Sequence, residues 1–290
     1  MTALPPHLWD IHFPAASKTL ADWKRGMHST FTGACPRLPT KHRFHRPPDK
    51  LCVVAPPSLS GASILWTCGA ELLLSRRVID ALARERCTGY VVHPISVQFR
   101  DAASGCTPDH DIEHQPAARV DEPHATYFKV TVTGWAGVAG EASGVRLISK
   151  CDGCGRLEYS GIHSPEHLLQ ESAWDGSDFA MLWPMPLRIF VSARAKELLH
   201  DIADHSLRFR TPRSIYDDSA TLREMGVDGY TPGRLVDWMP CAVARERGLS
   251  LGLYNDPVEG PGNEPGQYRW KSPGEGGAGG EREEGAVPLV

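Results

Sequence analysis

The sequence predicts an α+β protein with short mixed and antiparallel sheets, two similar strand–helix–strand units and a zinc-knuckle-like CxxCG turn. Three observations lead to this fold class. Short runs of β-branched and aromatic residues recur between turn-forming segments along the chain. Two of these runs end at a serine that is followed by a helical pattern. Glycine and proline occur 28 and 24 times in 290 residues, which favours short elements and many turns.

The bulk composition indicates a globular chain that binds neither nucleic acid nor membrane. Hydrophobic residues make up 41% of the chain, and the net charge of −4 offers no basic field to a polyanion. No apolar run reaches the roughly 18 residues of a membrane span, and the first residues lack the features of an export signal. We therefore expect a cytoplasmic protein whose eight cysteines are thiols or metal ligands rather than disulfides.

Composition divides the chain into five segments. They are a loop-rich N-terminal segment (1–50), a first α+β unit (51–150), the CxxCG knuckle with the second strand–helix–strand unit (151–215), a C-terminal extension (216–254) and a tail rich in Gly, Glu and Pro (255–290). The tail contains too few apolar residues to offset the entropy cost of ordering, so we expect it to be disordered.

The first unit contains one helix between strands. Ser75 is placed to cap a helix that ends at Thr88-Gly89, where glycine tolerates a left-handed turn. Residues 90–99 then predict one or two strands, broken at Pro94 because proline cannot donate to a ladder. Alternating β-branched and aromatic residues predict one further strand over 125–138.

The middle of the chain is richer in turns. Residues 101–124 are polar and predict a surface loop, and the glycine-rich stretch 134–144 predicts a hairpin turn. A strand over 145–150 follows and leads directly into the CxxC. Ser164 and Pro165 then form a helix-start pattern.

The second unit repeats the order of the first. A strand over 187–191 leads to Ser192 as helix cap, and residues 207–212 predict the closing strand. In both units an arginine follows two residues after the serine, at Arg77 and Arg194. The similarity reflects either a duplication or a common strand–helix–strand arrangement that occurs twice.

The segment CDGCGR, which starts at Cys151, contains the most specific motif in the sequence. A redox CxxC pair has its first cysteine at a helix N-terminus, whereas turn and strand residues follow here. A CxxCG after a strand is typical of a zinc knuckle, in which Cys151 and Cys154 supply two of four ligands. Three sets of residues could supply the others: Cys35 with His42 or His45, His163 with His167, and Cys106 with His110 or His114.

Catalytic motifs are not evident. The sequence has no nucleophile-elbow, HExxH, phosphate-loop or dinucleotide-binding motif in a productive context. The acidic clusters near Asp201 and Asp217 have the pattern of solvated surface. Two alternatives to a binding function stay open: an uncharacterised zinc protein whose metal only stabilises the fold, and a metalloenzyme with an open zinc position.

Together, CDGCGR, the later RIFVSARAKELL and LRFRTP segments and the earlier GACP resemble the double-CXXCG motif proteins over residues 20–215. These are paralogous proteins of social, predatory bacteria, and some members are immunity proteins of a contact-dependent toxin-exchange system. The resemblance implies that this chain binds and neutralises a cognate toxin. We expect it to use an acidic surface, with the 101–124 loop and the tail as candidate regions.

The first CXXCG of that family is altered in this chain. Cys35 matches its first cysteine, but Leu38 occupies the second cysteine position and Pro39 the glycine position. Either a nearby histidine replaces the lost thiolate or the metal is lost. Because imidazole binds zinc well, the resemblance implies a structural Zn²⁺ held by Cys35, His42, Cys151 and Cys154.

Overall fold

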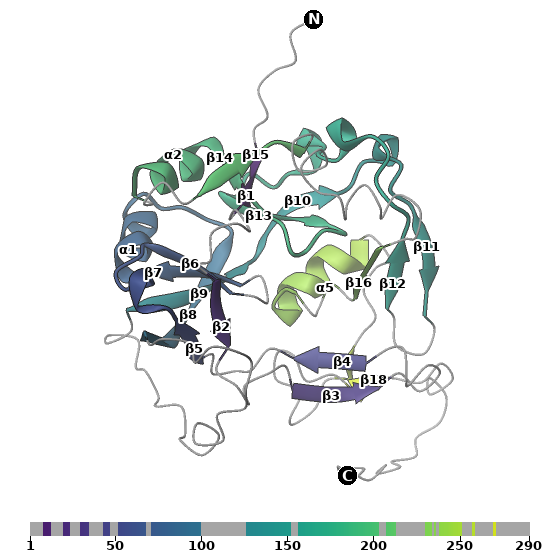
Figure 1. Ribbon diagram of the computed structural model, residues 1–290. Coiled ribbons are helices and arrows are strands. Elements are labelled where there is room, and N and C mark those ends of the chain that lie inside the picture. The colour runs from purple at the N-terminus through teal and green to yellow at the C-terminus, as the bar shows by residue number, and fades with distance from the viewer. Residues whose placement is uncertain are drawn as a thin grey trace, which may run out of the picture.

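A computed structural model of the 290-residue chain shows an α+β fold with mixed sheets, in which strands outnumber helices among the described residues (Figure 1). The structure describes residues 8–12, 20–23, 30–34, 43–46, 52–67, 71–99, 126–151, 156–202, 207–212, 230–233, 235, 238–250, 257–258 and 269–270. For strands β2, β3, β4, β16, β17 and β18, which are bounded below, only the backbone is described.

Six strands close into a barrel in the order β2-β5-β8-β9-β7-β6. They are β2 (Leu20–Trp23), β5 (Cys52–Ala55), β6 (Ile64–Thr67), β7 (Leu72–Ser75), β8 (Tyr90–Phe99) and β9 (Tyr127–Val132). A compact apolar cluster joins five of these strands, with the buried members Val53, Ala55, Leu65, Leu73, Ile95 and Tyr127. Alternation of side chains along each strand directs the intervening residues to the outside of the barrel.

Strand β8 is a single strand that passes through Pro94, so the prediction that Pro94 would break it was wrong. Its first part pairs with β9 up to the Ile95–Tyr127 pair, and its pairing with β5 begins only at Ser96. Pro94 therefore lies where β8 pairs with only one of the described strands. The missing N–H of proline costs little at such a position.

A five-stranded sheet lies beside the barrel in the order β10-β13-β14-β1-β15. Its strands are β1 (Leu8–His12), β10 (Gly134–Val138), β13 (Phe179–Trp183), β14 (Ile189–Ser192) and β15 (Arg208–Arg210). Only the β10–β13 pair is parallel. Strand β1, from near the N-terminus, lies between two strands that are about 200 residues later in the chain.

Two helices pack on each other at the junction of the barrel and the sheet, on the left of Figure 1. Helix α1 (Arg76–Arg84) follows β7 directly, and α2 (Ala193–Ile202) follows β14 directly. The apolar cluster between them and the strands includes Leu82 and Leu199, both 0% exposed. Burial of such side chains contributes roughly 2 kcal/mol each to stability.

The second large core lies on the other side of the five-stranded sheet. It includes Trp183, Leu157 and Ala244, which come from β13, from β12 (Leu157–Tyr159) and from α5 (Cys241–Ser250). The indole of Trp183 donates a hydrogen bond to the hydroxyl oxygen of Tyr159 at 2.7 Å, which satisfies the polar atom of this buried ring.

Short elements complete the described fold. Strand β11 (Leu147–Lys150) pairs with β12, which also pairs with β16 (Tyr230–Gly233). The two-stranded sheets are β3 (Thr30–Ala34) with β4 (Arg43–Arg46) and β17 (Pro257–Val258) with β18 (Arg269–Trp270). The 3₁₀ helices bounded within the described residues are η1 (Pro57–Leu59), η4 (Glu141–Ser143), η5 (Pro165–His167) and η6 (Glu171–Ala173).

Three local predictions were wrong, two of them because of strand pairing. The strand expected over 125–138 is divided into β9, in the barrel, and β10, in the five-stranded sheet. The glycine-rich stretch expected as a hairpin turn begins with β10 itself, since GWAGV pairs in parallel with β13. The helix expected at Pro165 is the short 3₁₀ helix η5, and Ser164 makes no side-chain capping bond.

Candidate functional site

The CxxCG segment lies in the connection between β11 and β12. Lys150 pairs with Leu157 at the end of the antiparallel ladder, and the backbone N–H of Cys151 donates to the carbonyl oxygen of Arg156 at 2.9 Å. Cys151 is half-buried and is not part of a disulfide. The motif therefore begins at the base of a hairpin. Cys154 lies outside the described residues.

The remaining predicted zinc ligands cannot be placed relative to this hairpin. Cys35 and His42 lie outside the described residues, as do Cys106, His110 and His114. Strands β3 and β4 are antiparallel, with Ala34 opposite Arg43. His45 belongs to β4, of which only the backbone is described.

Cys151, His163 and His167 belong to one of the alternative ligand sets and are described. The described part of the chain contains no group of three His, Cys, Asp or Glu side chains suited to a metal. The His163 ring instead lies against Gly144, where an added Cβ would be 2.6 Å from the ring Cδ2. His163 therefore packs against the η4 turn.

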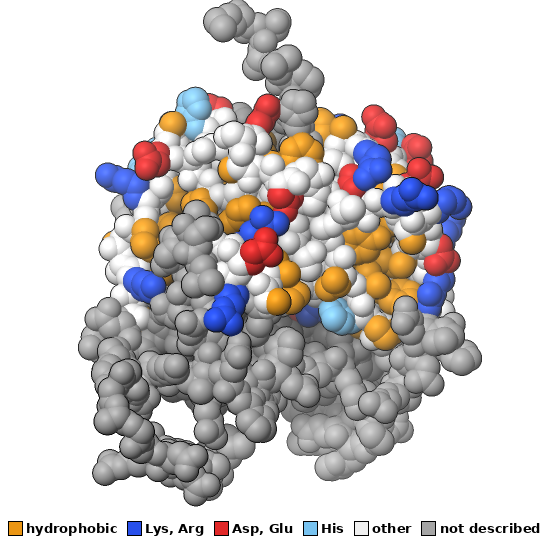
Figure 2. Space-filling view, turned by 180° about the vertical axis from the view of Figure 1, so that it is seen from behind, with side chains coloured by type: hydrophobic (Ala, Val, Ile, Leu, Met, Phe, Trp, Pro, Cys, Tyr) orange, Lys and Arg blue, Asp and Glu red, His pale blue; other side chains and the backbone are white. Residues whose placement is uncertain are grey.

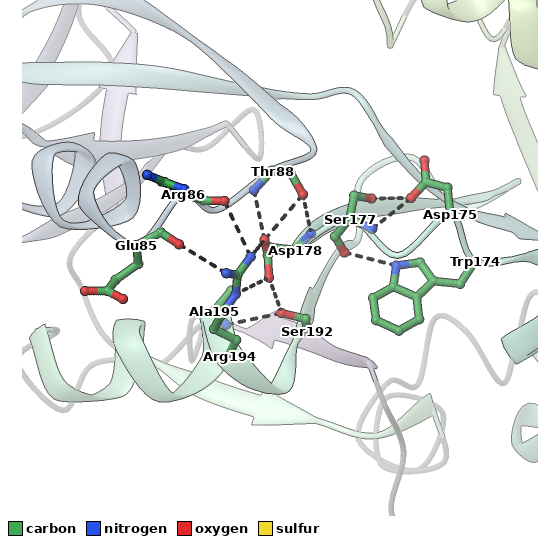
Figure 3. A network of polar contacts seen from close by, with 10 residues as sticks. All are labelled: Glu85, Arg86, Thr88, Trp174, Asp175, Ser177, Asp178, Ser192, Arg194 and Ala195. Carbon is green, nitrogen blue, oxygen red and sulfur yellow. Dashed lines mark hydrogen bonds and ion pairs between the residues drawn. The ribbon is translucent and has the colours of Figure 1, made fainter.

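The most extensive polar network in the described residues centres on Asp178, which precedes β13 and is 3% exposed (Figure 3). Its Oδ1 accepts hydrogen bonds from Ser192 Oγ at 2.7 Å and from Arg194 Nε at 3.1 Å. Its Oδ2 accepts from the backbone N–H of Thr88 at 2.9 Å, from the Thr88 hydroxyl and from Arg194 Nη2. The carboxylate thus joins the loop after α1 to the start of α2.

These hydrogen bonds determine the charge state of Asp178. Burial by itself would raise the pKa of this carboxyl, but the hydrogen bonds from Arg194, Ser192 and Thr88 outweigh burial and lower the pKa below its usual value. Arg194 extends the network, because its Nη1 donates to the carbonyl oxygen of Glu85 at 3.1 Å. Through Arg194, the ion pair with Asp178 links the end of α1, the start of α2 and the segment before β13.

The thiol of Cys87 lies close to this network but is not activated by it. Burial, with the negative charge of Asp178 as the next contribution, raises the pKa of the Cys87 thiol to about 11. A thiol with that pKa is protonated at neutral pH and is a poor nucleophile. The contacts around Asp178 are therefore suited to stabilising the packing of neighbouring elements rather than to nucleophilic catalysis.

Two glycines allow the strands to approach this loop closely. A Cβ on Gly89, whose φ is +86°, would overlap the Phe179 carbonyl oxygen and lie 2.7 Å from Ser177 Cβ. A Cβ on Gly134 would meet the same two residues. The loop that carries Asp178 therefore packs directly on backbone, which requires glycine on both sides.

Asp10 in β1 forms a second buried ion pair, with 0% of its side chain exposed. Its Oδ2 lies 2.8 Å from Arg210 Nη2 and 3.6 Å from Arg188 Nη1, whereas its Oδ1 has no hydrogen-bond partner among the described residues. Burial outweighs the two arginines and raises the pKa of Asp10 to about 6. This ion pair connects β1 to the neighbouring strand and to the residue before β14.

A third polar cluster lies on the barrel strands. Lys129 Nζ is 3.9 Å from Glu71 Oε1, and the hydroxyl of Thr67 donates to the Glu71 carboxylate. His93 is opposite Lys129 in the β8–β9 ladder. Burial lowers the pKa of both Lys129 and His93, with Glu71 partly offsetting the effect on Lys129. The lysine is thus matched by a carboxylate from its own chain.

Sequence reasoning did not single out Asp10, Asp178 or Arg210 as functional or structural residues. The only signal for this network was the Ser-x-Arg pattern of Ser192 and Arg194, whose two polar side chains both bind Asp178. The acidic partner is 14 residues earlier in the chain than Ser192. No local pattern could therefore have identified it.

Comparisons with known proteins identify no relative: no family model matches the sequence, and no curated protein matches it. The described helices contain none that is long and apolar enough to cross a membrane. On the face shown in Figure 2, acidic and basic side chains of the described residues are interspersed. The 101–124 loop and most of the tail, where we expect an acidic surface, lie outside the described residues.

Proposed function

We propose that this chain is an immunity protein, which binds a cognate bacterial toxin in the cytoplasm and neutralises it by covering its active surface. The observation that carries the proposal is the CDGCGR segment and its place in the order of elements, which resembles the double-CXXCG motif proteins. In the fold, Cys151 begins the hairpin connection between β11 and β12, and the β14–α2 segment follows later in the chain.

The polar networks of the described residues favour a binding function over a catalytic one. Both oxygens of Asp178 accept hydrogen bonds from the chain itself, and the Cys87 thiol is protonated at neutral pH. Lys129 is paired with Glu71. These groups stabilise the fold, so the activity that we propose depends on surface complementarity to a partner.

We also propose that a structural Zn²⁺ is held by Cys35, His42, Cys151 and Cys154. Three thiolates and one imidazole form a donor set that suits tetrahedral zinc, and the position of Cys151 at the base of a hairpin fits a knuckle. When bound, zinc would stabilise the fold by joining segments that are distant in sequence. His45 is the alternative fourth ligand.

The two strand–helix–strand segments are related units in this proposal. β7, α1 and β8 follow one another in the same order as β14, α2 and β15, and the two helices pack together. Ser75 and Ser192 occupy the same position, directly before the helix. A duplication of one ancestral unit accounts for both observations.

The function is tested with the product of the adjacent upstream gene. We expect that product to be toxic to a bacterial host and this chain to rescue growth. We also expect the two proteins to co-purify. A control culture co-expresses an unrelated acidic protein of similar size. If the neighbouring product is not toxic, or if this chain does not rescue growth, the proposal is wrong.

The zinc site is tested by metal analysis of the purified chain and of two cysteine variants. We expect about one zinc per chain in the natural protein and in Cys87→Ser, but loss of zinc in Cys151→Ser. Cys87 is the matched control because it is a half-buried thiol near Asp178 and is not one of the proposed ligands. Cobalt substitution then counts the ligands: a tetrahedral spectrum that is insensitive to added anions indicates four protein ligands, whereas anion sensitivity favours the metalloenzyme alternative.

A further inference from the structure

Strand β11 presents an unusual combination of exposed side chains at the edge of its sheet. All four of its residues are exposed, and they include Leu147 at 47% and Ile148 at 58%. The sheet order β11-β12-β16 gives β11 a single neighbour among the described strands. Exposed apolar residues that are adjacent on an edge strand mark an interaction surface or an aggregation hazard.

Strand β11 is irregular along its length, so it does not offer a further strand a regular edge. Its register against β12 shifts between Leu147 and Ser149, which places a bulge at Ile148. A bulge redirects side chains and interrupts the regular row of edge hydrogen bonds. The side chains of Leu147 and Ile148 are thus presented outward as an apolar projection, and we call residues 146–150 the β11 projection.

Basic residues flank the apolar pair. Arg146 and Lys150 are both exposed, and the described residues of the hairpin contain three basic side chains against one acidic side chain, Glu158. Glu158 accepts a hydrogen bond from Ser149 at 2.8 Å. In Figure 2, basic side chains lie above and below hydrophobic ones along the left margin, where β11 falls in this view. Arg146 and Lys150 therefore place a basic residue at each end of the apolar pair.

This charge pattern disfavours a second copy of the chain as the occupant. In an antiparallel pair centred on Ile148, Arg146 of each copy would face Lys150 of the other, and like charges directly opposite are destabilising. An apolar pocket with acidic residues at its rim would instead match both the apolar centre and the basic ends.

We propose that the β11 projection is the docking surface for the toxin, and that the toxin receives it in an apolar pocket with an acidic rim. The inference rests on the proposed function and adds to it the surface and the chemistry of recognition. Leu147 and Ile148 supply the buried contact. Arg146 and Lys150 accelerate encounter by attraction and set the orientation.

The test measures binding of the toxin to full-length variants by surface plasmon resonance. Ile148→Asp places a charge in the apolar centre and is expected to weaken binding by about 10-fold or more. Leu187→Asp is the matched control, because Leu187 is 42% exposed and lies outside β11. It is expected to change the affinity by less than about 3-fold.

A second pair of variants tests the charges. Arg146→Glu with Lys150→Glu is expected to lower the association rate by about 10-fold at low salt, and the effect should fade as salt is raised. Arg77→Glu with Arg84→Glu reverses two exposed charges on α1 and is expected to have little effect. Hydrogen exchange of the natural protein should show β11 protected by the toxin even if a variant fails to fold.

The outcomes separate the two proposals. If the natural chain binds and rescues but the β11 variants bind equally well and β11 gains no protection, the docking surface is wrong and the immunity function stands. If the natural chain does not bind the toxin, both proposals are wrong.

Discussion

Asp10 and Asp178 are two buried aspartates that each bind arginine, yet the pKa of the Asp10 carboxyl is raised and that of the Asp178 carboxyl is lowered. Both oxygens of Asp178 accept hydrogen bonds, from Ser192, Thr88 and Arg194, and its pKa is lowered. One oxygen of Asp10 has no partner among the described residues, and its pKa is raised to about 6. Completeness of hydrogen bonding, rather than the presence of an arginine, decides whether burial of the charge is offset.

The largest effect is expected from Asp178→Ala. The substitution leaves the Thr88 N–H and the Ser192 hydroxyl without their acceptor and removes the partner of Arg194, so we expect a loss of roughly 4 kcal/mol in the free energy of unfolding. Urea denaturation measures it. Asp80→Ala, at an exposed position on α1, is the control and should change stability by less than about 0.5 kcal/mol. Equal effects of the two substitutions would contradict a structural role for the network.

Asp10 should give stability a pH dependence that Asp10→Asn removes. The folded pKa of about 6 exceeds the ordinary aspartate pKa of 3.8, so between these values the folded state holds a proton that the unfolded state has released. The contribution of Asp10 is therefore fully present below about pH 4 and declines as the pH rises to about 6. The stability of the natural protein relative to Asp10→Asn should fall by about 3 kcal/mol across this range.

Denaturation of both proteins at several pH values measures this difference. Asp178 is expected to behave in the opposite way, since its lowered folded pKa gives a contribution that is present above the unfolded pKa and lost as the pH falls through the folded pKa. If the stability of the natural protein relative to Asp10→Asn is constant or rises with pH, the Asp10 carboxylate is better hydrogen-bonded than its contacts indicate.

Gly89→Ala should disturb the Asp178 region through the backbone. Gly89 and Gly176 both have positive φ, +86° and +82°, but only a Cβ on Gly89 would overlap neighbouring atoms. We expect Gly176→Ala to cost about 1 kcal/mol from the left-handed conformation and Gly89→Ala about 2 kcal/mol more. Thermal denaturation of the two variants compares them. Similar costs at both positions would mean that the Ser177 loop moves aside easily.

The smallest effects are expected at the two serines before the helices. Ser192 Oγ accepts from the Ala195 N–H at 3.2 Å and donates to Asp178, whereas Ser75 Oγ is buried with no partner among the described residues. Ser192→Ala should cost about 1–2 kcal/mol and Ser75→Ala less than about 0.5 kcal/mol. Differential scanning calorimetry resolves this difference. A larger loss for Ser75→Ala would reverse the comparison.

Local sequence patterns predicted helices and strands better than they predicted which strands and side chains contact each other. The strand into Ser75, helix α1, the strand into Cys151 and helix α2 all occur close to where hydrophobic periodicity and capping residues place them. The patterns failed at Pro94 and at Gly134, where strand β8 continues and a new strand begins. In both cases the outcome depends on which strand lies alongside, and that information is remote in the chain.

In the candidate site too, local patterns identified a residue but not its partners. Cys151 was identified from its motif and lies at the base of a hairpin, but the other predicted ligands are outside the described residues. Asp178 was not identified, because an isolated aspartate in a loop has no distinguishing pattern. Its role comes from a partner 16 residues away and another 90 residues away.

The amino-acid sequence by itself determined the α+β class, the helix that follows each serine and the position of the CxxCG segment after a strand. These features depend on interactions between residues that are near neighbours in the chain. Only the tertiary structure decided that the strands divide into a barrel and a separate sheet, and that Asp178 is ionised while Asp10 resists ionisation. Those outcomes depend on burial and on hydrogen bonds between distant segments, whose energies no local pattern encodes.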